Sequence, residues 1–526
     1  MKTFFSAWNQ PGNRWLAVLM SVLSGILLTA GFPKLELYPL AWIALIPLFS
    51  ALQGRNAKQA FILGFICGLA HYVTALYWIR YVIYHYGGIP LPLAIMVLLL
   101  LCAYLALYTG CFAVIANRWE QSPLLWVWAL PAVWVALEWV RAHALTGFPW
   151  ASLGYTQTPF EPLVQVADIT GVYGISWLII LGNTVLMGWL NQNGLRMNIL
   201  SSLTVAALFA GMLFYGFSRS EAIKALEAGA APLRAAVVQG NIDQAQKWEP
   251  SYQQETLERY RRLSLEAARQ NPRPDLIVWP ETSAPFFYGI QEDLSRQLDD
   301  IVREVGIPVL FGSPGVKVVD GERRLVNRAY LADETGRPIG YYDKQHLVPF
   351  GEYVPYQKVL FFVHKLVQAA GNFAAGDNPA PIEWGDQRLG VLICYEAIFP
   401  ELAREQLDRG ASILVNITND AWFGMTSAPY QHMEIARWRA VEFRAPLIRS
   451  ANTGVSAVFD STGKALGTIP LNEEGYLVAA VQPLYIVTFY AKWGDVFAWI
   501  CVLTSVGGLL YSTQGLKRRV YSTRKA

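Results

Sequence analysis

The chain has 526 residues, of which 54% are hydrophobic and 15% are charged, and its formal net charge is +3. So much apolar and so little charged sequence is typical of a membrane protein. The small net charge gives no support for nucleic-acid binding. Five scattered cysteines exclude a disulfide scaffold and a CxxC-type metal cluster. We therefore expect neither a metal site nor a nucleic-acid partner.

About eight apolar runs have roughly the length that a helix needs to cross a hydrocarbon core. The shortest, Pro39–Leu52, is tilted or partly re-entrant in this interpretation. The pattern predicts a helical membrane domain of about seven spans over residues 1–220, and a last span with a basic tail over residues 490–526. The runs are Trp15–Phe32, Pro39–Leu52, Ala60–Ile79, Leu91–Ala116, Leu124–Val140, Tyr173–Leu190, Ile199–Phe217 and Val496–Tyr511.

Basic residues collect in every second loop between these runs, with exceptions at Lys34, Arg80 and Arg141. Lysine and arginine mark the cytoplasmic side of a membrane protein. Both termini are therefore expected in the cytoplasm, and the long segment before the last span on the opposite face. In a bacterium that face is the periplasmic side of the inner membrane. The residues are Lys2, Arg14, Arg55, Lys58, Arg118, Arg196, Lys517, Arg518, Arg519, Arg524 and Lys525.

The segment over residues 230–483 has a different composition, because charges return and short β-type runs alternate with helical ones. Glu255–Ala268 is expected to form an amphipathic helix. Alternating strands and helices favour a layered α/β domain. The expected strands are Ala235–Gln239, Leu276–Trp279, Pro308–Gly312, Gly390–Cys394, Ser412–Ile417, Leu447–Ala451 and Ser456–Asp460.

Glu138 and Arg141 lie one helical turn apart at the end of the fifth apolar run. Ionisable groups at membrane depth are costly and often functional. The pair lies near the membrane interface and one turn apart, so a simple local ion pair is the stronger interpretation, and a functional role stays open beside it.

Three places in the α/β segment carry an ionisable side chain just beyond a strand or in a loop: Glu281, Lys344 and Cys394. A thiol becomes a nucleophile when a base takes its proton, and a poorly solvated glutamate can be that base. A fixed ammonium can stabilise the oxyanion of a tetrahedral intermediate. The three residues are thus a sufficient set for acyl transfer. Individually, Cys394 could be a small buried hydrophobe and the other two solvated surface.

The order of the surrounding motifs resembles the nitrilase, or carbon–nitrogen hydrolase, superfamily. Because this domain precedes a last membrane span, the whole chain is similar to the apolipoprotein N-acyltransferase family within it. The motifs are Trp279–Glu281, Asp343–Lys344, Pro349–Glu352 and Cys394–Glu396, with support from Leu145–Trp150, Val238–Ile242, Lys344–Pro355 and Asn419–Gly424.

This resemblance implies an αββα sandwich with Glu281 as general base, Lys344 as oxyanion stabiliser and Cys394 as nucleophile. Glu352 matches a second glutamate that supports the lysine, and Tyr395 supplies the backbone N–H beside the nucleophile. Glu396 and Trp248 match positions that influence activity.

The reaction implied by the resemblance is ping-pong, and it is the last step of bacterial lipoprotein maturation. Cys394 takes the sn-1 acyl chain of a phospholipid, expected to be phosphatidylethanolamine, as a thioester. The α-amino group of an S-diacylglyceryl-cysteine at the N-terminus of an apolipoprotein then accepts it. No cofactor is needed. Water must be kept from the thioester, and we expect apolar loops around Phe362 and around Trp422 and Phe423 to control entry.

Two other functions remain as alternatives. A membrane-tethered nitrilase-type amidase would use the same three residues on a soluble amide, although one anchor would then suffice. A transporter with a large outer domain is a different class. Against it, the apolar runs show no inverted repeat and no pair broken by glycine or proline at matching positions.

Overall fold

The computed structural model describes residues 14–191, 194–354 and 373–523. The chain forms two compact units. One unit, here called the helical unit, comprises residues 1–77, 95–217 and 493–526. The other, here called the sandwich unit, comprises residues 78–94 and 218–492.

The helical unit is a bundle in which α4 packs on α2, and α7 packs on both α10 and α17. A Cβ atom added at Gly25 of α2 would lie 2.4 Å from the carbonyl oxygen of Cys67 on α4, so the two helices approach closely there because the residue is glycine. The elements that fall wholly or partly in this unit are α2 (Arg14–Ala30), η1 (Tyr38–Trp42), α3 (Ile46–Leu52), α4 (Ala57–Ala75), α6 (Leu91–Trp119), η2 (Leu125–Ala129), α7 (Leu130–His143), η3 (Leu153–Gln157), α8 (Glu161–Val164), α9 (Ala167–Thr170), α10 (Tyr173–Leu190), α11 (Leu195–Gly229) and α17 (Val496–Thr523).

Among the described residues, five helices are long and apolar enough to cross a membrane, or six if α4 and the following α5 (Ile79–His85) form one broken span. The first expected span corresponds to α2, which has 17 residues. The expected run Pro39–Leu52 is divided between η1 and α3, and Pro47 lies in the first turn of α3. Proline has no N–H to continue a preceding helix, so it begins a new one. The count of about eight spans stays a prediction.

Glu138 and Arg141 both bind the loop that follows α7. The Oε1 atom of Glu138 accepts hydrogen bonds from Trp134 Nε1 at 2.9 Å and from the backbone N–H of Leu153 at 2.7 Å. Arg141 donates to the carbonyl oxygen of Trp150, and to Ser152 Oγ at 3.1 Å. These contacts give both buried side chains a role in fixing the loop, which differs from a simple local ion pair.

The sandwich unit contains two six-stranded sheets, with strand orders β12-β1-β2-β3-β4-β5 and β11-β10-β9-β8-β7-β6. The central pairs β1–β2, β2–β3, β7–β8 and β8–β9 are parallel, and the outer pairs are antiparallel. The strands are β1 (Leu233–Gln239), β2 (Leu276–Val278), β3 (Val309–Val319), β4 (Glu322–Ala332), β5 (Pro338–Asp343), β6 (Ile382–Trp384), β7 (Gln387–Ile393), β8 (Ile413–Thr418), β9 (Leu447–Ala451), β10 (Ser456–Phe459), β11 (Ala465–Ile469) and β12 (Gly475–Val481).

Side chains from alternate positions of each central strand enter different cores. Ala235 and Val237 of β1 pack between the two sheets, whereas Ala236 and Val238 pack against helices. Strands buried on both faces need apolar residues at consecutive positions, which is why the central strands are continuous apolar runs in the sequence.

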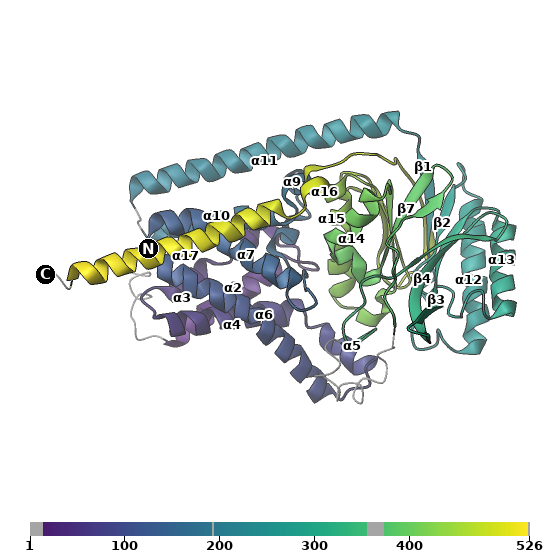
Figure 1. Cartoon of the computed structure of the whole chain (residues 1–526), viewed down its shortest axis with the longest axis horizontal. Helices are drawn as coiled ribbons and strands as arrows, with labels where there is room; N and C mark the ends of the chain where they lie inside the picture. Colours follow the sequence, from purple (N-terminus) through teal and green to yellow (C-terminus); the bar gives the residue numbers. More distant parts are fainter. Residues whose placement is uncertain (1–13, 192–193, 355–372, 524–526) are drawn as a thin grey trace. The chain divides into compact units, whose positions relative to one another are not determined.

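Helices cover the outer face of each sheet. The core that contains Tyr260 and Val302 joins α12 (Pro250–Ala268) and α13 (Glu292–Val305) to the first sheet. The core that contains Ala403 and Ala440 joins α14 (Pro400–Asp408) and α15 (Ala428–Phe443) to the second sheet. Figure 1 shows α12 and α13 beyond β3 and β4, and α14 and α15 on the other side near β7. The predicted αββα sandwich is confirmed.

Candidate active site

Glu281, Lys344 and Cys394 each follow directly on a strand of the sandwich. Glu281 lies three residues after β2, Lys344 is the first residue after β5, and Cys394 is the first residue after β7. The three residues are 6%, 1% and 8% exposed, respectively. Because a rigid strand ends at each of these points, the fold aims the three reactive groups from fixed positions.

The Glu281 carboxylate is held by two hydrogen bonds. Its Oε1 atom accepts from Asn327 Nδ2 at 2.6 Å, and its Oε2 atom accepts from the backbone N–H of Asn419 at 2.8 Å. The turn lies close to β3, since a Cβ atom added at Gly312 would lie 2.4 Å from the backbone nitrogen of Thr282. Glycine at position 312 therefore lets the carboxylate turn pack directly on the sheet.

The Lys344 ammonium lies in a buried cluster with Glu352. Its Nζ atom donates to Glu352 Oε1 at 2.9 Å, and Glu352 Oε2 accepts from the backbone N–H of Val348 at 2.8 Å. Asn327 Nδ2 also donates to Glu352 Oε1 at 3.2 Å, so one amide group contacts both glutamates. Burial lowers the pKa of Lys344, but Glu352, Cys394 and Glu281 together raise it above its ordinary value. The lysine is therefore a permanent cation.

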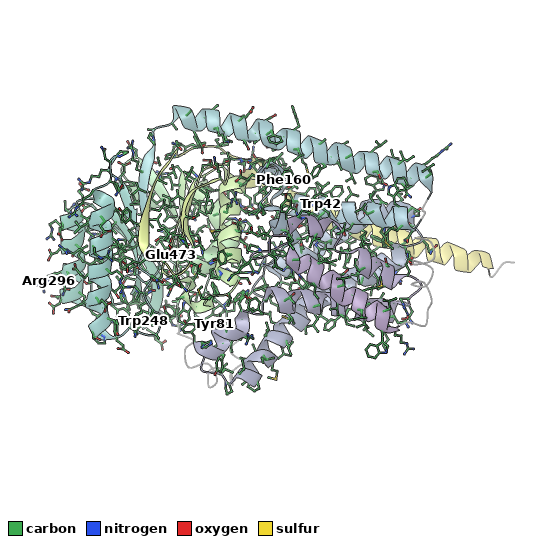
Figure 2. The ribbon with its side chains drawn as sticks, turned by 180° about the vertical axis from the view of Figure 1, so that it is seen from behind. Trp42, Tyr81, Phe160, Trp248, Arg296 and Glu473 are labelled. Carbon is green, nitrogen blue, oxygen red and sulfur yellow. The ribbon has the colours of Figure 1, made fainter. Side chains whose placement is uncertain are left out.

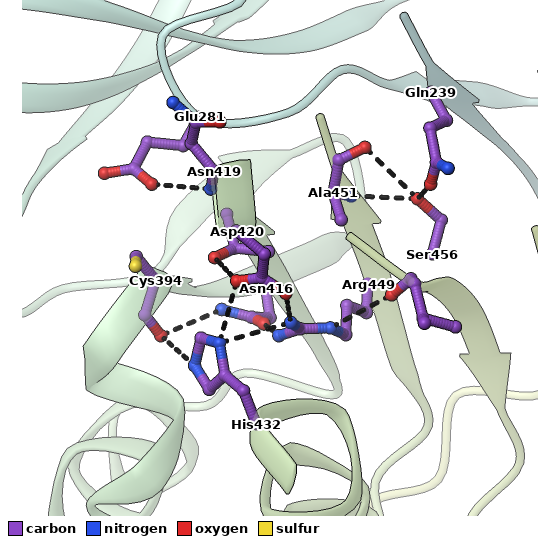
Figure 3. A network of polar contacts seen from close by, with 12 residues as sticks. Gln239, Glu281, Cys394, Asn416, Asn419, Asp420, His432, Arg449, Ala451 and Ser456 are labelled. Carbon is purple, nitrogen blue, oxygen red and sulfur yellow. Dashed lines mark hydrogen bonds and ion pairs between the residues drawn. The ribbon is translucent and has the colours of Figure 1, made fainter. Parts of the chain in front are cut away.

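Cys394 occupies a left-handed backbone conformation, with φ of +53°. Residues other than glycine, asparagine and aspartate rarely adopt this conformation, and backbone strain of this kind is concentrated at functional sites. The pKa of the thiol is raised, first by burial and then by Glu281, whereas Lys344 lowers it. Both charges thus act on the sulfur, which points toward the Glu281 carboxylate in Figure 3. The net effect on the pKa of the thiol is upward, which favours its protonated form.

Glu396 connects the lysine segment to the cysteine turn. Its Oε1 atom accepts from Tyr342 Oη at 3.1 Å and from the backbone N–H groups of Gln345 and His346 at 2.6 and 3.0 Å. Its Oε2 atom accepts from the backbone N–H of Ile393 at 2.7 Å. Burial raises the pKa of Glu396 to about 7, against the opposing effect of these backbone donors and Lys344. The contacts supply a positional reason for this residue that the sequence did not offer.

Tyr395 and Trp248 differ in their surroundings. The Tyr395 ring packs edge-on against Phe399, with 5.0 Å between ring centroids, and lies 5.9 Å from the His346 ring. Trp248 is 46% exposed and lies on the surface of the sandwich unit, as Figure 2 shows. The structure therefore anchors the Tyr395 ring beside Cys394 and leaves the Trp248 ring partly exposed.

The expected gating residues Trp422 and Phe423 lie on a short helix, η6 (Asp420–Phe423). Within the sandwich unit they contact the aromatic segment around α5. Trp422 packs edge-on against Tyr86 at 4.9 Å, and Phe423 packs edge-on against Trp78 at 5.0 Å. Trp422 is 36% exposed. The third expected gating residue, Phe362, lies outside the described residues.

Sequence reasoning missed several residues that touch the reactive groups. Asn327 lies in β4, which was not predicted as a strand, and no local pattern marks it. Asn419, the first residue after β8, belongs to the motif Asn419–Gly424, but its contact with Glu281 was not predicted. His432 on α15 donates through Nε2 to the carbonyl oxygen of Cys394 at 3.1 Å. The position of Asn419 just after the carboxyl end of a parallel strand beside β7 was the signal for its contact with Glu281.

Two family models match the chain. Residues 24–185 match the apolipoprotein N-acyltransferase N-terminal domain, and residues 234–489 match the carbon-nitrogen hydrolase. Among solved structures, an amidase from Nesterenkonia sp. AN1 is similar to this chain. The match covers 50% of this chain and 97% of the amidase chain, with 24% sequence identity and a TM-score of 0.36. The second match, together with the sandwich fold, places residues 234–489 in the class of carbon–nitrogen hydrolases.

The relatives define the family more narrowly. The apolipoprotein N-acyltransferase of Geobacter metallireducens is 45% identical over 92% of this chain and 93% of its own. That of Methylococcus capsulatus is 34% identical over 91% of this chain and 93% of its own. The chain belongs to the apolipoprotein N-acyltransferase family, and it is an acyltransferase.

Proposed function

We propose that this protein moves an acyl chain from a phospholipid to the α-amino group of an S-diacylglyceryl-cysteine at the N-terminus of an apolipoprotein, through a thioester on Cys394. The observation that carries the proposal is that a carboxylate, a cation and a thiol are buried together. Asn327 Nδ2 donates to both Glu281 and Glu352, and Glu352 accepts from Lys344 Nζ at 2.9 Å. The sulfur of Cys394 points toward the Glu281 carboxylate in Figure 3. A base and an oxyanion stabiliser are what a cysteine nucleophile needs.

In the first half-reaction Glu281 takes the proton of Cys394, and the thiolate attacks the sn-1 ester carbonyl of the phospholipid. The Lys344 ammonium and the Tyr395 backbone N–H stabilise the oxyanion. The C–O bond of the ester breaks, the lysophospholipid takes the proton from Glu281, and the acyl thioester remains. Glu352 supports this step by holding the ammonium in place at 2.9 Å.

In the second half-reaction the free α-amine attacks the thioester carbonyl. Glu281 accepts the amine proton and returns a proton to the sulfur as the C–S bond breaks. The products are an amide and the regenerated thiol. Thioesters react readily with amines, so the sequence needs no cofactor. We take phosphatidylethanolamine as the donor.

The same proposal places the protein in the bacterial inner membrane. The apolar helices of the helical unit supply the spans, and the clusters of basic residues put both termini in the cytoplasm. The segment over residues 230–483 is then the periplasmic catalytic domain, and residues 1–220 and 490–526 supply the membrane part.

A vesicle assay with two kinds of acceptor tests the function. Full-length protein in phosphatidylethanolamine vesicles receives either a diacylglyceryl lipopeptide with a free α-amine or the same lipopeptide with an acetylated amine. With the free amine we expect N-acyl lipopeptide and an equal amount of lysophospholipid over many turnovers. With the acetylated amine we expect no N-acyl lipopeptide, and no more lysophospholipid than the single equivalent per enzyme that thioester formation releases. Hydrolysis of a short soluble amide without any acyl transfer would instead establish the amidase alternative.

We also propose that Trp422, Phe423 and Phe362 limit the access of water to the thioester. Trp422 and Phe423 form an aromatic cluster with Tyr86 and Trp78, and Tyr86 Oη donates to the carbonyl oxygen of Ala421 at 3.1 Å. Opening an apolar cover admits water to a reactive intermediate.

In the vesicle assay, Trp422→Ala should therefore raise the share of free fatty acid among the products by several-fold. A change of that size is expected when the free energy of one hydrophobic contact is lost. Trp499→Ala, at an exposed tryptophan of α17, is the matched control. An unchanged ratio of fatty acid to N-acyl product in the Trp422 variant would contradict the gating role.

A further inference from the structure

A buried polar network lies directly behind the nucleophile, and the reaction steps above do not use it. It consists of Asn416, Asp420, His432 and Arg449, each no more than 1% exposed. Figure 3 shows these four side chains grouped around the backbone of Cys394. Buried charged and polar groups are costly unless they are paired, and the members of this network pair with one another and with the Cys394 backbone.

The network binds the backbone carbonyl group of Cys394. The Nε2 atom of His432 donates to that oxygen at 3.1 Å, and Asn416 Nδ2 approaches it at 3.5 Å. A carbonyl oxygen only accepts hydrogen bonds, so Nε2 carries a hydrogen whatever the charge of the ring. The residue held in this way is the one whose φ is +53°. An unusual backbone conformation persists only where its surroundings determine it.

The imidazole is itself fixed from the opposite side. Its Nδ1 atom lies 3.0 Å from Asp420 Oδ1, and Arg449 Nη2 donates to Asp420 Oδ2 at 2.6 Å. Arg449 also donates to Asn416 Oδ1. Burial alone raises the pKa of Asp420, but Arg449 and His432 hold it below its ordinary value. A buried ion pair therefore sets the position of the ring.

The same chain segment also holds the general base. The backbone N–H of Asn419 donates to Glu281 Oε2 at 2.8 Å. Asn416, Asn419 and Asp420 lie within or just after the end of β8, which pairs in parallel with β7, the strand that leads to Cys394. One strand end thus fixes Glu281 from one side and the Cys394 backbone from the other.

We propose that His432, held by Asp420 and Arg449, is a positioning residue for the nucleophile. Its hydrogen bond to the Cys394 carbonyl keeps the strained turn in the orientation that aims the sulfur at Glu281 and at the Lys344 ammonium. This inference rests on the proposed function for its role in acyl transfer, but the placement of the thiol can be measured without an acyl donor.

The test compares two substitutions in the full-length protein in detergent micelles. In His432→Leu the ring is replaced by a group of similar bulk that cannot donate. In His432→Gln the Nε2 amide can still reach the carbonyl. The first readout is the rate at which iodoacetamide alkylates Cys394, measured against pH by intact mass. The second is kcat and KM for acyl transfer from vesicles. Gln431→Ala, the neighbouring position on α15, is the control for helix packing.

We expect His432→Leu to lower the alkylation rate and kcat by about 10- to 100-fold with little change in KM, the scale of one lost buried hydrogen bond. His432→Gln should recover most of both rates, and Gln431→Ala should match the wild type. If the leucine variant does not fold, His432→Asn replaces it, because its shorter amide cannot reach the carbonyl.

The proposal would be overturned if a folded His432→Leu or His432→Asn variant were alkylated at Cys394 as fast as the wild type. It would also be overturned by a folded glutamine variant that is as slow as the leucine variant, since the effect would then be one of packing alone. Failure of the proposed function has a different signature: the alkylation rates follow the expected order, but vesicles yield no acyl transfer in the wild type.

Discussion

Replacing Lys344 with methionine should reduce acyl transfer by at least about 10³-fold, because one oxyanion donor is worth about 10²–10³ in kcat and two buried carboxylates also lose their cation. Methionine keeps the length of the side chain and removes only its charge and donors. Glu352 then loses the ammonium that lies 2.9 Å away, and Glu281 loses its electrostatic interaction with the positive charge of Lys344. The first half-reaction should be affected most, so the initial release of lysophospholipid is the quantity to measure.

Lys464→Met, at an exposed lysine of the same unit, is the matched control and should transfer acyl chains normally. The pKa of Lys344 is raised above its ordinary value, so the ammonium should stay charged near neutrality and add no inflection to the pH–rate profile there. A loss smaller than about tenfold in Lys344→Met would remove this lysine from the mechanism.

Replacing Glu396 with alanine should have the second largest effect, on stability and activity together. The carboxylate accepts hydrogen bonds from Tyr342, Gln345, His346 and Ile393. Each buried donor that is left without an acceptor costs about 1–3 kcal/mol. The backbone donors lie directly beside Lys344 and Cys394, so the two reactive groups lose their common attachment. We expect a clear fall in melting temperature and a loss of at least about 10²-fold in kcat.

Glu396→Gln separates the two contributions. It keeps one acceptor oxygen but presents an amide donor to the other N–H groups, so its melting temperature and kcat should lie between those of the wild type and the alanine variant. Glu405→Ala, at a half-exposed glutamate of α14 that pairs with Arg409, is the control. A Glu396→Ala variant as stable and active as this control would show that the four contacts do not matter.

Much of the sandwich could be predicted because its central strands are buried on both faces. Val237 and Val391 belong to continuous apolar runs that end in a proline, a turn or a reactive residue, and these are local features. The edge strands are less apparent. β12 pairs with β1 more than two hundred residues away in the chain, and no local pattern encodes such a pairing.

The helical unit shows the same limit in another form. The run Ile199–Phe217 predicted a span of membrane length, but the helix continues to Gly229 and has 35 residues. The residues after Phe217, which include Glu221, Ala222 and Lys224, are strong helix formers without being apolar. Hydropathy identifies what a membrane accommodates, not where a helix ends.

The motifs at the site could be located, but not their connections. Glu396 and Trp248 were found by resemblance without a reason, and the structure supplies one only for Glu396. Asn327 lies 46 residues along the chain from Glu281, which it binds, and His432 lies 38 residues from Cys394, which it binds. Their roles depend on the folded arrangement, so a single sequence carries no signal for them.

Intact-mass spectrometry after exposure to phosphatidylethanolamine tests the central claim most directly. The wild type should carry a fatty-acyl adduct that hydroxylamine removes, and Cys394→Ala should carry none. Adding a diacylglyceryl lipopeptide should discharge the adduct and yield N-acyl lipopeptide. A wild type that transfers acyl chains while its mass stays unmodified at every time point, or an adduct that persists in Cys394→Ala, would contradict a thioester on this residue.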